Sequence, residues 1–269
     1  MAKLLIAGYG FLGEALAREF SAAGWEITTL SRSDEANLRC DISAADQVSA
    51  LPGSYDLVIQ CAATGGGGEE GYRRVYLDGS KNLLGRFSDA EFIFVSSTSV
   101  YAQADHSEVD ESSPAEPTTV TGKILKQAED QVLASGGAVA RLSGLYGPAR
   151  CHILKNLLAG KAKLDGQGDR VMNYVHRDDA ARALSIISKE MSGESRLYNV
   201  SAGSVTQRDC YRQLADHFSL PMPPSVESDG TVRKRGNSSK YVSSARIEAL
   251  GWKPAYPDFL SLALACEIA

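Results

Sequence analysis

The sequence predicts an α/β fold in which a doubly wound parallel sheet is joined to a smaller C-terminal lobe. Three observations support this fold class. A short apolar run ended by glycine opens the chain at 3–8, strand-like and helix-like segments then alternate, and the pattern loosens after about residue 150. Parallel strands need crossover helices between them, so this alternation is typical of a doubly wound sheet. We therefore expect a first domain over 1–150, with 171–202 returning to it, and a smaller lobe over 151–269.

Each element is predicted from its own pattern. Short apolar or β-branched runs predict strands, whereas apolar residues spaced three and four apart predict helices. The expected strands are 3–8, 26–30, 37–40, 55–63, 91–97, 137–147, 171–175 and 196–200. The expected helices are 11–24, 43–50, 72–87, 118–134, 178–190 and 206–218. Asp178 and Asp179 are expected to cap the helix that begins at residue 178.

Composition excludes several classes of protein. The 269 residues are 43% hydrophobic and 23% charged, and the net charge of −5 argues against a nucleic-acid binder. The five cysteines have no CxxC spacing and the four histidines no metal-ligand spacing, which predicts buried thiols and no metal site. No segment approaches the roughly 20 apolar residues of a membrane span, and the N-terminal run is too short for a signal peptide. We expect a cytoplasmic protein.

The strongest motif is G-x-G-x-x-G at Gly8-Tyr9-Gly10-Phe11-Leu12-Gly13, between a predicted strand and a predicted helix. Gly8 would permit the tight turn, Gly10 would let the backbone approach a pyrophosphate, and Gly13 would let the helix pack close to the sheet. The N–H groups at the start of the helix, near Phe11 and Leu12, would face the phosphates. This context predicts a dinucleotide-binding Rossmann domain.

The end of the second strand bears on the choice of dinucleotide. It reads Leu30-Ser31-Arg32-Ser33, without a carboxylate for the ribose 2′-hydroxyl of NAD before Asp34. Arg32 could bind a 2′-phosphate instead, so we predict NADP, with NAD as the alternative. A solvated surface role for Arg32 is the competing interpretation. Asp41 could accept from the adenine amino group or cap the helix at 43–50.

Further motifs follow in order along the chain. They are CAA (61–63), GSKNLL (79–84), SSTSVYA (96–102), RLSGLYGP (141–148), NYVHRDDAARAL (173–184), YNVSAG (198–203) and ALGWKP (249–254). With the glycine motif, the chain resembles extended short-chain dehydrogenases/reductases of the NAD(P)-dependent epimerase/dehydratase group. This resemblance implies an oxidoreductase or epimerase acting on a hydroxyl or carbonyl of a sugar or nucleotide sugar. It also implies that Ala62 and Ala63 lie under the cofactor, and that a homodimer could form through the helices at 72–87 and 118–134.

The resemblance implies an active site with one part replaced. Relatives have a Ser or Thr, then Tyr-x-x-x-Lys one helical turn apart. Ser97 matches the serine and Lys123 the lysine, which would bind the nicotinamide ribose, but Thr119 stands at the tyrosine position. The pKa of an alkyl hydroxyl lies far above that of tyrosine, which is about 10, so Thr119 could relay a proton but not act as a phenolate. Losing a positioned acid–base group typically costs on the order of 10²–10⁴ in rate.

Three tyrosines could replace the missing group: Tyr101, Tyr72 and Tyr76. Tyr101 follows the serine strand, where relatives use it structurally, and Tyr76 could simply pack. The residues after Ser97 are Thr98-Ser99 rather than the Asp-Glu of dehydratases, so dehydration is not expected by that route.

Two loops could also take part in binding. The glycine run at 65–68 could form a flap over the cofactor or a flexible loop. The RKRG segment at 233–236 could bind an anionic substrate or be a solvated loop.

Two functions therefore remain. The first is an NADP(H)-dependent enzyme with an altered proton donor. The second is a non-catalytic NADP(H)-binding sensor or scaffold.

Overall fold

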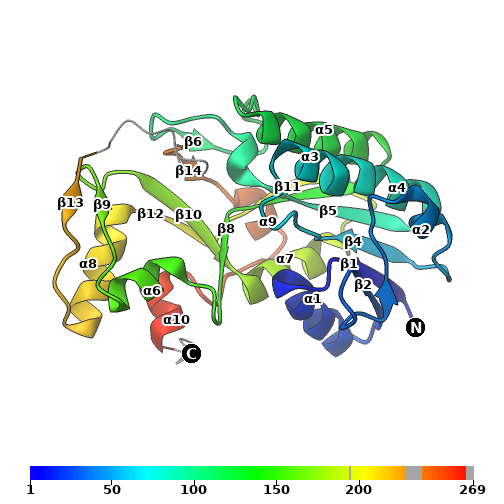
Figure 1. Cartoon of the computed structure of the whole chain (residues 1–269), viewed down its shortest axis with the longest axis horizontal. Helices are drawn as coiled ribbons and strands as arrows, with labels where there is room; N and C mark the ends of the chain where they lie inside the picture. The colour runs from blue at the N-terminus through cyan, green and yellow to red at the C-terminus, as the bar shows by residue number, and fades with distance from the viewer. Residues whose placement is uncertain (194, 228–237, 265–269) are drawn as a thin grey trace.

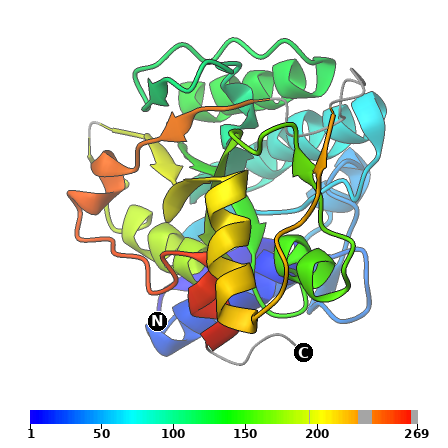
Figure 2. The ribbon, with the colours of Figure 1, turned by 90° about the vertical axis from the view of Figure 1, so that its left-hand side faces the viewer.

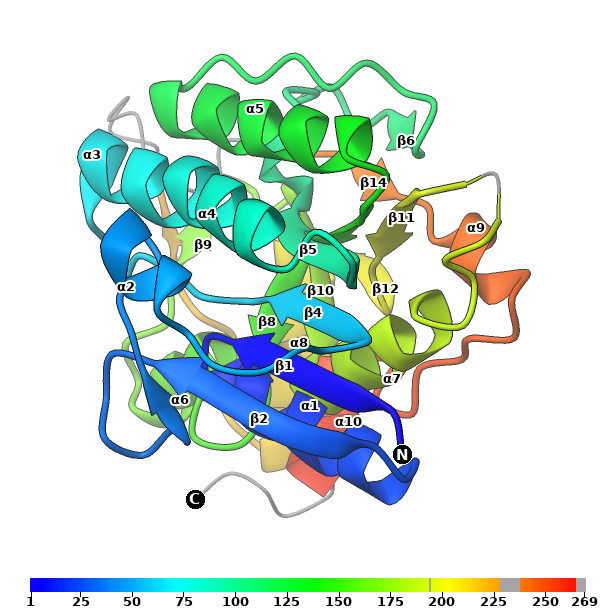
Figure 3. The ribbon, with the colours of Figure 1, turned by 90° about the vertical axis from the view of Figure 1, so that its right-hand side faces the viewer.

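The structure is a computed structural model of the chain, and it describes residues 1–193, 195–227 and 238–264, with side chains as far as residue 261. Within this part of the chain, the largest element is a seven-stranded parallel sheet (Figure 3). Its strands in spatial order are β11 (Leu197–Val200), β7 (Ala138–Leu142), β5 (Glu91–Ser97), β4 (Leu57–Gln60), β1 (Lys3–Ala7), β2 (Glu26–Ser31) and β3 (Leu38–Arg39). The chain order reverses between β1 and β4, which confirms the predicted doubly wound α/β fold.

Helices cover both faces of this sheet, because its central strands are apolar on both sides (Figure 1). Leu4 and Ile6 of β1 belong to one core, which they share with α1 (Phe11–Ala22) and α7 (Arg177–Ile187). Leu5 and Ala7 face the opposite core. The elements over that core are α2 (Ala45–Ser49), α3 (Gly68–Tyr72), a π-helical segment (Arg73–Asp78), α4 (Gly79–Arg86) and α5 (Val120–Ala134).

A second lobe stands beside the carboxyl ends of the main strands (Figure 1). It contains a small sheet of β12 (Gly203–Thr206), β10 (Val171–His176) and β8 (Gly144–Tyr146). Figure 2 shows α8 (Gln207–Phe218, yellow) crossing this lobe, with α6 (His152–Leu158) and α10 (Phe259–Leu264) nearby. Short pairs complete it: β9 (Leu164–Asp165) with β13 (Ser225–Val226), and β6 (Glu108–Val109) with β14 (Tyr241–Val242). A final short helix, α9 (Ala245–Glu248), packs near β11.

The strand predicted at 137–147 is wrong as a single element. It divides at Ser143, so that β7 lies in the main sheet and β8 in the small sheet. The segment 171–202 returns to the main sheet only in part. Its α7 packs on α1 and its β11 extends the main sheet, whereas β10 belongs to the small sheet. The domain boundaries themselves stay a prediction.

The predicted caps of the helix at 178–190 are also wrong. The helix α7 begins at Arg177, and its N-cap is His176, whose ring accepts the N–H of Asp178 at 3.2 Å. Asp178 and Asp179 lie in the first turn, where acidic residues favour the helix dipole. The buried carboxylate of Asp179 instead accepts the backbone N–H groups of Ala255 and Tyr256, at 2.8 and 2.9 Å. It therefore anchors the C-terminal segment to α7.

Candidate functional site

The glycine turn after β1 has a specific shape. Gly8 has φ +122°, and a Cβ placed there would lie 2.3 Å from the backbone nitrogen of Ala62. A Cβ on Gly13 would lie 2.2 Å from the carbonyl oxygen of Gly8, whereas a Cβ on Gly10 would meet nothing within 4 Å. Packing of the chain against itself therefore requires glycine at Gly8 and Gly13. Beside Gly10 the backbone borders open space, and a bound pyrophosphate needs such space to approach the backbone.

The start of α1 offers donors and positive charge beside this space. Its N-cap is Gly10, which supplies no side-chain cap, so the first N–H groups of this 12-residue helix have no side-chain acceptor from that residue. The guanidinium groups of Arg150 and Arg177 each lie 4.9 Å from the ring centre of Phe11. Leu12 is buried and fixes the helix on the core. The turn thus fits an anionic group such as a pyrophosphate.

The strand β4 ends beside the same turn. Cys61 donates its thiol hydrogen to the carbonyl of Gly8 over 3.2 Å, and burial raises the pKa of Cys61 to about 12. Ala62 borders the turn and is half-buried, while Ala63 is exposed. Small side chains at these two positions leave the surface next to the turn uncovered.

The residues that follow β2 are those predicted to bind the adenosine end of the dinucleotide. The hydroxyl of Ser31 accepts the backbone N–H of Ser33 at 3.0 Å, which forms a tight turn. This turn holds Arg32 between the two serines, and Arg32 is exposed.

Asp41 does not cap α2, whose N-cap is Ala44. Its carboxylate accepts the N–H of Ser43 at 3.0 Å and pairs with Arg74 at 3.0 Å. Burial pushes the pKa of Asp41 upward, but hydrogen bonds from Ser43 and the charges of Arg74 and Arg32 together hold it below its usual value. Asp41 is therefore an ionised acceptor near the end of β3.

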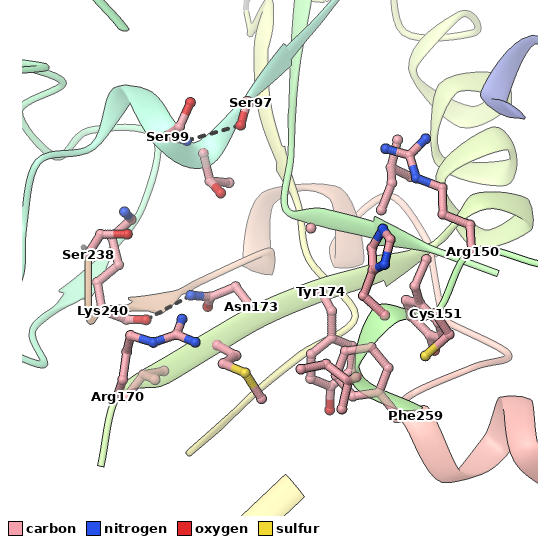
Figure 4. A pocket seen from close by; sticks show the side chains of 18 residues that line it. Ser97, Ser99, Arg150, Cys151, Arg170, Asn173, Tyr174, Ser238, Lys240 and Phe259 are labelled. Atoms are coloured by element: carbon pink, nitrogen blue, oxygen red, sulfur yellow. Dashed lines mark hydrogen bonds between the residues drawn. The ribbon is translucent and has the colours of Figure 1, made fainter. Parts of the chain in front are cut away.

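At the end of β5, Ser97 is half-buried and its hydroxyl accepts the N–H of Ser99 at 3.2 Å. This bond begins a 3₁₀ turn over Thr98–Val100. The turn presents the hydroxyl groups of Ser97 and Ser99 to a cavity of about 330 Å³ (Figure 4).

The structure does not place Lys123 in this cavity. Thr119 is the N-cap of α5 and its hydroxyl accepts the N–H of Gly122 at 3.1 Å, so it serves the helix start. Lys123 is exposed, while the positions that face the sheet include Leu125 and Ala128. At 100° per residue, Lys123 points away from the sheet, and Thr121 lies one turn before Leu125 on the inner side. The role of Lys123 as a ribose ligand stays a prediction.

Tyr101 is held by contacts inside the protein. Its side chain is buried, and its hydroxyl lies 2.7 Å from the carbonyl of Asp110 and accepts from Arg141 at 2.8 Å. Arg141 is in turn paired with buried Glu129 at 2.6 Å. Burial raises the pKa of Tyr101, so its hydroxyl does not ionise readily. Tyr101 is also not among the residues that line the cavity.

The other two tyrosine candidates lie on the helical segment after β4. The rings of Tyr72 and Tyr76 meet edge to face with centres 4.9 Å apart, and Tyr76 also contacts Phe94 at 6.2 Å. Neither lines the cavity that contains Ser97.

Positive charge also lines this cavity. Its lining includes Arg150, Arg170 and Lys240, and the lining residues that the structure describes include no Asp or Glu. Sequence reasoning missed all three cations, because they come from separate segments and follow no short motif. The RKRG segment at 233–236, which was considered for anion binding, lies outside the described residues.

Lys240 is 2% exposed and donates from Nζ to the carbonyl oxygen of Tyr101 over 2.9 Å. Burial lowers the pKa of Lys240 to about 8.

In the described ranges, no three His, Cys, Asp or Glu residues cluster in a way that could hold a metal ion. No helix in the same ranges is both long and apolar enough to span a membrane. Cys40, Cys61, Cys151 and Cys210 are free thiols.

Comparison with known proteins adds independent evidence. Residues 4–201 match the model of the NAD dependent epimerase/dehydratase family. The chain is 31% identical over 285 residues to "Protein YeeZ" of Escherichia coli K12, with 98% of this chain and 100% of that protein covered. It shares its fold with Thermus thermophilus UDP-glucose 4-epimerase in complex with NAD, at TM-score 0.79, 18% identity and 99% coverage of both chains. RMD from Pseudomonas aeruginosa complexed with NADPH also shares the fold, at TM-score 0.76, 22% identity and coverage of 99% and 100%.

Proposed function

Because the chain belongs to the NAD-dependent epimerase/dehydratase family, we propose that it is an NADP(H)-dependent oxidoreductase or epimerase with an altered proton donor. Its substrate would be an anionic hydroxyl or carbonyl compound, with sugars carried on a nucleotide as the first class to test. One observation carries this proposal: the cavity that contains Ser97 is also lined by three cations, and its described lining includes no carboxylate. A surface of that charge favours phosphate or carboxylate groups.

Residues of the glycine turn and the neighbouring strand ends would hold the dinucleotide. A bound nicotinamide dinucleotide supplies or accepts the hydride in this family's chemistry. The backbone at Gly10 and the N-terminus of α1 would bind its pyrophosphate, and Arg150 and Arg177 would add positive charge over Phe11. Ser97 would orient the substrate oxygen, since its hydroxyl faces the cavity.

Preference for NADP would come from Arg32, which is exposed between Ser31 and Ser33. Relatives in complex with NAD and with NADPH share this fold, so local residues after β2 must decide between the two. A charge-assisted hydrogen bond contributes roughly 1.5–3 kcal/mol, or about 10- to 150-fold in Kd.

A fluorescence titration with NADPH and NADH tests this preference. Arg32→Ala should weaken NADPH binding by about 10- to 150-fold and leave NADH binding nearly unchanged. The control is Arg39→Ala, which removes an exposed arginine that pairs with Asp34 at 2.9 Å. Equal losses for both dinucleotides, or equal losses in both variants, would contradict the NADP assignment.

The substrate class can be tested by calorimetry with nucleoside diphosphates. Arg150→Ala and Arg170→Ala remove cations of the cavity wall and should each weaken binding. Arg212→Ala, on the exposed side of α8, serves as the matched control. If the control and cavity variants bind equally well, the anionic substrate is the wrong assignment.

The second candidate function is a non-catalytic NADP(H)-binding sensor or scaffold. It is favoured by the position of Thr119 as a helix cap and of Lys123 on the exposed side of α5. Only the enzyme should oxidise bound NADPH when carbonyl compounds are added, and Ser97→Ala should then abolish turnover. The cytoplasmic location and the homodimer stay predictions, and sedimentation of the purified protein would test the dimer.

A further inference from the structure

The cavity lacks a proton donor from the helix where relatives carry one. Thr119 is used as a cap, Lys123 is exposed, and Leu125 occupies the inner side of α5 one turn later. We infer that Lys240 holds the reacting oxygen of the substrate in this cavity and donates the proton that relatives take from tyrosine. This inference rests on the proposed oxidoreductase function.

The position of Lys240 is fixed by contacts on both sides. Its backbone carbonyl accepts from Nδ2 of Asn173 at 2.9 Å, and the N–H of Val242 donates to Oδ1 of the same side chain at 3.0 Å. Its Nζ donates to the carbonyl of Tyr101, the residue that ends the turn begun by Ser97. Figure 4 shows Lys240 between Arg170 and the turn that carries Ser97 and Ser99. Lys240 therefore lines the same cavity as the serines, and its amine is bonded to the end of the turn that carries them.

The bonding of Lys240 leaves donors for a substrate. An ammonium group has three N–H bonds, and the carbonyl of Tyr101 takes one of them. No carboxylate in the described part of the chain forms an ion pair with this lysine, and none lines the cavity. A buried charge without a carboxylate partner is costly, and a substrate oxygen that accepts from it would offset part of that cost.

Other titratable groups in the cavity are poorer donors. The hydroxyl of Tyr146 donates to the backbone of Tyr256 or Asp258 at 3.0 Å, and burial raises its pKa. Burial also raises the pKa values of Tyr174 and Cys151, so both hold their protons more tightly.

Lys240 differs because burial brings its pKa down to about 8. Near neutral pH the amine is then mostly protonated and still able to release its proton. Its remaining charged or titratable neighbours in the lining are the guanidinium groups of Arg150 and Arg170 and the exposed ring of His152.

The proton step balances without a further reactant. As hydride reaches the carbonyl carbon, the C=O π pair moves to oxygen, which forms an O–H bond while one N–H bond of Lys240 breaks. The carbonyl is reduced and the dinucleotide is oxidised. The neutral amine then recovers its proton from water.

Labelling with pyridoxal 5′-phosphate tests the inference without turnover. This anionic aldehyde forms an imine with a neutral amine and releases water, and borohydride reduces the imine to a stable amine that peptide mass spectrometry locates. At pH 7, a pKa of about 8 gives Lys240 a neutral fraction on the order of 10² larger than an ordinary lysine near 10.4. We expect Lys240 to be labelled faster than exposed lysines such as Lys163, by at most on the order of 10²-fold because an amine that is 2% exposed is reached less readily.

Variants identify the adduct. Lys240→Arg keeps the charge but should remove the fast adduct, whereas Lys163→Met should remove only its own slow one. Labelling confined to exposed lysines would overturn the inference and leave Lys240 as a structural tie to Tyr101. So would a Lys240→Met protein that reduces a carbonyl compound as fast as the unmodified chain.

Failure of the proposed function has a different signature. In that case Lys240 is labelled rapidly, but the protein binds neither NADPH nor NADH.

Discussion

Alanine at two neighbouring glycines should separate cofactor binding from stability. At Gly10 a new Cβ meets no atom within 4 Å and φ is −136°, so Gly10→Ala should change the free energy of unfolding by less than about 0.5 kcal/mol. The new methyl group would occupy the space assigned to the pyrophosphate. If that displaces one charge-assisted hydrogen bond, the loss is roughly 1.5–3 kcal/mol, or about 10- to 150-fold in Kd for NADPH.

At Gly13 the same substitution meets the backbone. Its Cβ would lie 2.2 Å from the carbonyl oxygen of Gly8, so either α1 or the turn must shift. Overpacking of this kind costs typically about 1–3 kcal/mol, which for a chain of this size lowers Tm by roughly 2–12 °C.

Thermal unfolding of each apo-protein and fluorescence titration with NADPH would separate the two effects. A Gly10→Ala protein that binds NADPH as tightly as the unmodified chain would refute the pyrophosphate site. A Gly13→Ala protein of unchanged Tm would refute the packing argument.

Two further predictions concern helix starts. Because the hydroxyl of Thr119 accepts the N–H of Gly122, Thr119→Ala should cost about 1 kcal/mol in unfolding free energy, while Thr119→Ser should cost less. Neither change should alter NADPH affinity in a titration, and a large loss of affinity would mean that Thr119 contacts the cofactor. At α7, burial lowers the pKa of His176 to about 4, whereas an unfolded histidine titrates near 6.5. Between these two pKa values the unfolded chain binds a proton that the folded chain does not. The free energy of unfolding should therefore be greatest above about pH 6.5 and fall by up to about 3 kcal/mol by pH 4. Urea denaturation across this range should show a shallower pH dependence for His176→Asn, which keeps a capping acceptor, and an unchanged slope would contradict the assignment.

The sheet and the glycine turn were predictable because their signals are local. An apolar run such as Leu4-Leu5-Ile6 must be buried on both sides. The glycine spacing is required because side chains at Gly8 and Gly13 would clash with nearby backbone. The break at Ser143 had no such signal, because β7 and β8 are both apolar and differ only in their distant partners.

The helical phase of α5 could be read from the sequence, whereas the role of Lys123 stays a prediction. The apolar residues Ile124, Leu125, Ala128 and Val132 define the buried side of α5, and Lys123 lies outside that stripe. A tyrosine–lysine spacing alone does not define this helical phase. Lys240 could not have been predicted, since its position depends on Tyr101, which is 139 residues away in the chain.

The place of β11 at one end of the main sheet has a consequence for synthesis of the chain. β7 pairs with β5 on one side, but its other neighbour is made only when residues 197–200 emerge. A nascent chain that has been made only as far as β7 therefore still has one unpaired edge, on a strand whose residues are all buried in the complete structure. Open apolar edges of this kind pair readily with other chains, so the growing polypeptide is exposed to aggregation at this edge until β11 is made.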